Sequence, residues 1–65
     1  MAVGEWIEWT GGAMPVDYGT LVEVRHRDGE EVIEKAGEGY AEDWSIDQFE
    51  HWDGDIMAYR IVTPD

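Results

Sequence analysis

The sequence contains no cysteine, and its 4 basic residues are far outnumbered by 16 acidic ones. Without cysteine the chain can form no disulfide and no thiolate zinc site, and it has no thiol for catalysis. Long apolar runs are also absent, since no stretch approaches the roughly 20 residues that span a membrane. Residues 1–5 lack the basic and apolar regions of a secretory signal peptide. We therefore expect a cytoplasmic protein.

What the sequence does have is negative charge and aromatic residues. A formal net charge of -12 on 65 residues repels nucleic acid and anionic membranes and attracts basic surfaces, although such a charge can also serve solubility alone. Four Trp, three Tyr and one Phe argue against disorder, which goes with low hydrophobicity. A chain of this length forms one domain, residues 1–65, with a small core.

The hydrophobic pattern predicts four strands, over residues 5–10, 20–27, 30–35 and 55–62. Val22 and Val24 alternate with charged residues and should face the core. The second and third strands are separated by Asp-Gly, the preferred two-residue type I′ hairpin turn, which would place Arg27 opposite Glu30. Pro64 should end the last strand.

A short helix is predicted after the third strand. Ser45 and Gln48 stand at the two positions of a capping box, in which each side chain bonds to the backbone amide of the other residue. Trp44 and Phe49 stand where a hydrophobic staple would join the first turn to the residue before it.

Gly54 fits the left-handed residue that ends a helix, so the predicted helix covers residues 46–53. The expected fold class is α+β: a small antiparallel sheet of three to four strands with one short helix.

This helix would lie inside the most acidic part of the chain. Residues 38–55 hold seven acidic residues and no Lys or Arg. Asp47, Glu50 and Asp53 are three apart, a spacing of about 5–6 Å on a helix, which would form a row comparable in scale to the phosphates of a nucleic acid strand. Trp52 is a candidate interface anchor. The predicted partner-binding residues are Glu38, Glu42, Asp43, Asp47, Glu50, Trp52, Asp53 and Asp55.

Other chemistry has weaker support. Asp53 and Asp55 flank a glycine, but the ligand spacing of a calcium loop is absent, so we expect no metal and no cofactor. The single Ser is assigned to a helix cap, and the two His residues, His26 and His51, lie on a strand and on the predicted helix. So short a chain can hardly enclose a substrate pocket of roughly 300–1,000 Å³. We expect no enzyme activity and no catalytic residues.

Several short motifs resemble a small domain found in phage and prophage proteins. The motifs are Trp6-Ile7-Glu8-Trp9, Gly11-Gly12, Pro15-Val16, Val22-Glu23-Val24-Arg25, Arg27-Asp28-Gly29 and the strand that follows Asp55. The small size and the acidic segment also resemble phage-encoded anti-CRISPR proteins of the type I-C group. Several anti-CRISPR proteins act by imitating DNA.

The resemblance implies an inhibitor in the host bacterial cell that acts as a DNA mimic. Its partner would be a basic nucleic-acid-binding protein such as a Cas surveillance-complex subunit, with no direct contact to nucleic acid or membrane, and it would be a monomer. The alternative is an SH3-like structural or accessory phage domain without inhibitory activity, whose charge only maintains solubility.

Overall fold

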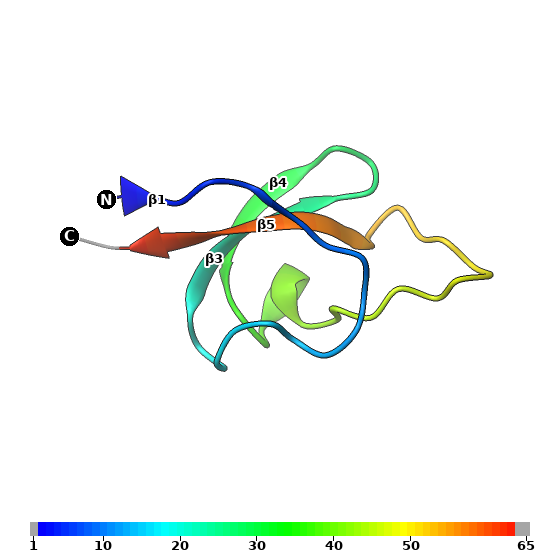
Figure 1. The fold of residues 1–65 in the computed structure, drawn as a ribbon, viewed down its shortest axis with the longest axis horizontal. Coiled ribbons are helices and arrows are strands. Elements are labelled where there is room, and N and C mark those ends of the chain that lie inside the picture. The colour runs from blue at the N-terminus through cyan, green and yellow to red at the C-terminus, as the bar shows by residue number, and fades with distance from the viewer. Residues whose placement is uncertain (1, 64–65) are drawn as a thin grey trace.

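The computed structural model describes residues 2–63, so the strand end predicted at Pro64 lies outside the described residues. The molecule is elongated, with extents of 40 × 21 × 18 Å, because one long loop projects from a small sheet (Figure 1). The elements in order are β1 (Ala2–Val3), β2 (Ile7–Glu8), β3 (Leu21–His26), β4 (Glu31–Lys35), the 3₁₀ turn η1 (Gly39–Ala41) and β5 (Ile56–Thr63).

β5 lies at the centre of an antiparallel sheet. β3 pairs with one side of β5 and carries β4 on its far side, while β1 and β2 both pair with the other side of β5. The bond from Gly4 N to Ile61 O (2.8 Å) continues this pairing between β1 and β2, so the N-terminal segment acts as one interrupted edge strand. The predicted antiparallel sheet is thereby confirmed.

The core lies against one face of this sheet. Val22 and Val24 are fully buried, as their alternation predicts, and Tyr59 is the cross-strand partner of Val24. Tyr59 forms an edge-to-face cluster with Trp9 and Trp44, whose ring centroids lie 5.4–5.9 Å from one another and from Tyr59. Such pairs add roughly 0.5–1.5 kcal/mol each beyond the area they bury. The packing of these three aromatic rings therefore stabilises a small core.

Each of these two indoles has a hydrogen-bond partner. Trp44 Nε1 donates to Ala41 O in η1, and Trp9 Nε1 donates to Trp44 O, both at 2.7 Å. These bonds tie the segment after η1 to the core and to the N-terminal segment. Trp44 therefore anchors the first part of the projecting loop to the core.

The other face of the sheet is closed by stacked charges. The guanidinium groups of Arg25 and Arg60 both stack on the ring of Trp6, with their Cζ atoms 4.3 Å and 4.4 Å from the ring centroid. Arg60 pairs with Glu23, and Arg25 Nε donates to Glu31 Oε2 at 2.8 Å. This face therefore uses two of the four basic residues inside the fold.

The turn between β3 and β4 differs from the predicted one. Gly29 has a positive φ (92°), but Asp28 does not, whereas a type I′ turn needs two such residues. His26 N donates to Glu30 O (2.8 Å) and Gly29 N to His26 O (2.9 Å), which closes a loop of three residues with a left-handed glycine. The extra loop residue shifts the register by one, so Arg25 faces Glu31, and the predicted pairing of Arg27 with Glu30 is wrong.

The predicted helix is also wrong, since residues 46–53 are irregular. Its cap does not form because Asp43 Oδ1 accepts both the Ser45 amide (3.0 Å) and the Ser45 hydroxyl (2.6 Å). The Asp47 carboxylate likewise accepts the amides of Phe49 (2.7 Å) and Glu50 (3.1 Å). Short side chains that bond to nearby amides offer the backbone an alternative to the helix.

Tertiary packing does not rescue this segment. An isolated helix of about 8 residues is unstable in water unless one face is buried, and Phe49, the expected anchor, is 87% exposed. Gly54 lacks the left-handed φ that was expected to end the helix. Residues 2–63 contain one 3₁₀ turn and no α-helix, so this part of the chain is mostly antiparallel sheet rather than α+β.

Candidate functional site

The candidate site is the loop of residues 42–54, here called the acidic loop, which joins η1 to β5 and projects beyond the sheet (Figure 1). It contains five acidic residues and no Lys or Arg. Its two Asx-type turns, at Asp43 and Asp47, give the backbone local order without a helix. The Phe49 and Glu50 amides also lower the pKa of the Asp47 carboxyl below its ordinary 3.8, so this side chain keeps its charge in mild acid.

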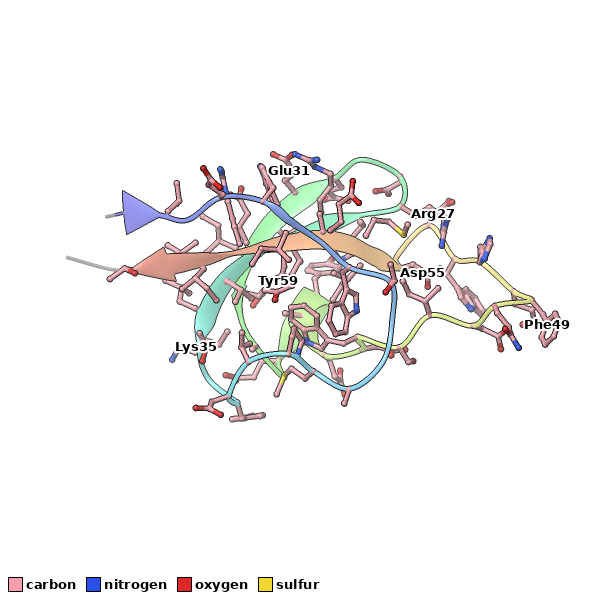
Figure 2. The ribbon with its side chains drawn as sticks, in the orientation of Figure 1. Arg27, Glu31, Lys35, Phe49, Asp55 and Tyr59 are labelled. Carbon is pink, nitrogen blue, oxygen red and sulfur yellow. The ribbon has the colours of Figure 1, made fainter. Side chains whose placement is uncertain are left out.

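The base of the acidic loop is fastened to the β3–β4 hairpin. Asp55 Oδ2 accepts from Arg27 Nη2 (3.0 Å), Arg27 Nε (3.2 Å) and Trp52 N (3.0 Å). Backbone bonds from Arg27 N to Asp55 O (2.8 Å) and from Asp28 N to Asp53 O (3.2 Å) run beside this pair. Figure 2 shows Arg27 and Asp55 together at the root of the loop, with Phe49 at its tip.

Asp55 is charged although it is only 6% exposed. Burial alone raises the pKa of its carboxyl, but the Trp52 amide and the Arg27 guanidinium outweigh that effect and hold the pKa below the ordinary 3.8. Asp55 was predicted to bind a partner, but the structure uses it to hold the loop. We therefore leave it out of the proposed surface.

Large aromatic side chains lie exposed among the carboxylates. The exposed fractions are 87% for Phe49 and 66% for both Trp52 and Tyr40. Aromatic residues of this kind, next to charged groups, commonly anchor protein interfaces. The sequence predicts Trp52 as an interface anchor. It assigns Phe49 to a helix staple instead, and Tyr40 is not among the predicted partner-binding residues.

A hollow of about 350 Å³ lies between the acidic loop and the hairpin. The imidazole of His26 lines it and is buried, with Nε2 3.2 Å from Tyr40 O. Four carboxylates surround it, two from the loop side and two from the hairpin: Glu42, Asp43, Asp28 and Glu30. The sequence pattern indicates only a turn role for Asp28, and no sequence signal brings the hairpin beside the acidic loop.

The basic residues near this surface are already occupied. All three arginines form ion pairs inside the fold, namely Arg25 with Glu31, Arg27 with Asp55 and Arg60 with Glu23. Within residues 2–63, none of the four carboxylates around the hollow lies within ion-pair distance of an Arg or Lys. The acidic loop and the hollow thus form one surface of uncompensated negative charge.

The predicted residues are only partly brought together. Glu42 and Asp43 line the hollow, while Asp47, Glu50, Trp52 and Asp53 are exposed along the acidic loop. Glu38 is exposed at the start of η1, outside the loop. Because the helix is absent, Asp47, Glu50 and Asp53 do not form the regular row that was expected.

Neither a metal cluster nor a membrane span is found in the described part of the chain. No group of three or more His, Cys, Asp or Glu among residues 2–63 is arranged to hold a metal ion. No helix in the same range is long and apolar enough to cross a membrane. Comparisons of the chain with protein-family models, curated proteins and solved structures find no match, so the residues of this chain alone support a functional conclusion.

Proposed function

We propose that this protein is an acidic inhibitor that occupies a basic, nucleic-acid-binding surface of a partner protein. The observation that carries the proposal is the acidic loop. It projects from the sheet (Figure 1), has five carboxylates and no Lys or Arg, and carries Phe49, which is 87% exposed, at its tip (Figure 2). Basic surfaces that bind DNA do so mainly through Lys and Arg placed against phosphates. An acidic loop whose base is held by the Arg27–Asp55 pair would compete with DNA for the same Lys and Arg side chains.

The proposed competition depends on charge and position rather than on copying the geometry of a DNA strand. Without a helix the carboxylates have no constant spacing, so a close imitation of consecutive phosphates is not part of the proposal. Electrostatic complementarity would speed and orient the encounter. Phe49 and Trp52 would then supply the apolar anchors that phosphates lack.

The resemblance to anti-CRISPR proteins indicates which partner to test. It implies the DNA-binding surface of a type I-C CRISPR surveillance complex in a bacterial host. The alternative, an SH3-like structural or accessory phage domain, predicts no effect of the acidic loop on DNA binding.

The test is a competition assay with purified surveillance complex and labelled target DNA. The wild-type chain should displace the DNA, and the Glu42→Lys/Glu50→Lys variant should lose at least about tenfold in potency, because two attractions become repulsions. Neither side chain makes a hydrogen bond within the described residues, so the fold should survive. Potency should also fall steeply as the salt concentration rises.

The matched control is Glu5→Lys/Asp17→Lys, which makes the same change in net charge at exposed positions outside the acidic loop. This variant should retain most of the potency. Equal loss in both variants would mean that only the overall charge matters, and absence of displacement by the wild-type chain at low salt would refute the CRISPR target.

A further inference from the structure

The outer edge of β4 has backbone groups that the fold does not use. β4 is last in the sheet order, and the bonds from His26 N to Glu30 O and from Ala36 N to Thr20 O (both 2.8 Å) show which residues face β3. Even-numbered residues of this segment bond to β3, so the N–H and C=O groups of odd-numbered residues point away from it. Glu38 N donates to Lys35 O (3.0 Å), but no described residue bonds to the outward backbone groups of Glu31 or Ile33.

The side chains along this edge are self-complementary. Glu31, Ile33 and Lys35 lie on the same face at successive outward positions, with the apolar residue between opposite charges. Ile33 is 44% exposed. Figure 2 shows Glu31 and Lys35 at the two ends of β4. A two-fold axis at Ile33 would therefore place each acid opposite a base.

We propose that β4 pairs antiparallel with β4 of a second copy of this chain. Ile33 would face its own counterpart, and Glu31 would face Lys35 of the second copy in two symmetric pairs. Arg25 Nε occupies Glu31 Oε2 and leaves Oε1 for this contact. A parallel arrangement would instead place like charges opposite each other, so the charge pattern selects the antiparallel dimer.

Two features oppose this pairing and make it conditional. Charged side chains on an edge strand commonly prevent association. In β4 every antiparallel two-fold register other than the one centred on Ile33 would place like charges opposite each other. The net charge of -12 on each copy also produces long-range repulsion, which salt screens. The dimer should therefore form at high protein and salt concentrations, while the monomer expected from the sequence dominates in dilute solution.

The test is sedimentation equilibrium of the full chain at protein concentrations up to about 1 mM, in low and high salt. The wild-type mass should rise from 7.4 kDa towards twice that value, and more readily at high salt. This salt dependence is opposite to that of the proposed inhibition, so the failure of one proposal is distinguishable from the failure of the other. A mass of 7.4 kDa under all conditions would overturn the dimer.

Charge exchange tests the register. Lys35→Glu alone and Glu31→Lys alone should each weaken dimerisation about tenfold or more, because both symmetric pairs become repulsive. The Glu31→Lys/Lys35→Glu double variant restores opposite charges across the interface and should recover part of the association, with the recovery limited by the loss of the Arg25–Glu31 ion pair within each copy. Dimerisation that is unaffected by either single change would place the interface elsewhere.

Proline at the centre of the edge provides a second test. Ile33→Pro removes an N–H that points away from β3, so it should abolish dimerisation and leave the β3–β4 bonds intact. Far-ultraviolet circular dichroism would check the fold. A folded Ile33→Pro protein that still dimerises like the wild type would refute pairing through this edge.

Discussion

The strongest stability prediction concerns Asp55, the buried carboxylate at the base of the acidic loop. Replacing Asp55 with Asn retains its size and one carbonyl oxygen but removes the negative charge that faces Arg27. The Asp55 carboxylate accepts one bond from the Trp52 amide (3.0 Å) and two from the Arg27 guanidinium (3.0 and 3.2 Å). We expect Asp55→Asn to lower the free energy of unfolding and to loosen the loop.

The magnitude follows from the kind of bond that is lost. A hydrogen bond to a charged group contributes about 1.5–3 kcal/mol and a neutral one about 0.5–1.5 kcal/mol. Because the Arg27 side chain is 28% exposed, water compensates it in part, and we expect a total loss of about 2 kcal/mol. A domain of this size has a free energy of unfolding of roughly 3–10 kcal/mol, so this loss is a large part of the total. At about 4–8 °C per kcal/mol, the melting temperature should fall by about 8–16 °C.

The assay is urea unfolding followed by tryptophan fluorescence, since Trp44 is buried and Trp9 is partly buried in the core. Removing any carboxylate also relieves repulsion in a protein with this net charge, so a matched control is needed. Asp53→Asn removes the same charge from an exposed side chain two residues away. It should leave stability unchanged or raise it slightly.

The difference between the two variants isolates the contribution of the buried negative charge of Asp55, through its bonds to Arg27 and to the Trp52 amide. If Asp55→Asn and Asp53→Asn unfolded at the same urea concentration, this buried charge would contribute nothing to stability. The loop would then be held by its backbone bonds alone, and the assignment of Asp55 to a structural role would be refuted.

The stability difference between the wild type and Asp55→Asn should also depend on pH, because the pKa of Asp55 is lower in the folded state than its ordinary 3.8. The difference should be complete above pH 3.8 and shrink as the pH falls below that value, which thermal melts at a series of pH values would measure. Gly37→Ala should cost about 1–3 kcal/mol in urea unfolding, because Gly37 has a φ of 91° and its added methyl group would collide with the ring of Tyr18. Trp44→Phe should cost about 2 kcal/mol in the same assay, since it removes the buried bond to Ala41 O together with part of the ring. A loss below about 0.5 kcal/mol in either variant would contradict the stated cause.

Local sequence patterns predicted the sheet well except at its N-terminal edge, where the strand predicted over residues 5–10 is reduced to Ile7–Glu8. Alternation placed Val22 and Val24 in the core, and each is fully buried in the structure. The long apolar strand after Asp55 became β5, the centre of the sheet. These predictions succeed because strand alternation reports directly which side chains leave water.

Sequence patterns that are compatible with two local backbone conformations gave wrong predictions. Ser45 and Gln48 fit a capping box, but Asp43 lies two residues before Ser45 and binds its amide and hydroxyl instead. The Asp28–Gly29 pair fits a two-residue turn, but only the glycine adopts a positive φ and the loop takes a third residue. Small differences in local free energy decide such cases, and the sequence pattern does not contain them.

The sequence by itself determined the composition of the acidic segment, its lack of Lys and Arg, and its aromatic residues. Only the tertiary structure decided how these groups are used. It buried Asp55 against Arg27, exposed Phe49 and brought Asp28 and Glu30 of the hairpin beside Glu42 and Asp43. The physical reason is that burial and charge pairing depend on contacts between segments distant in the chain, which no local pattern records.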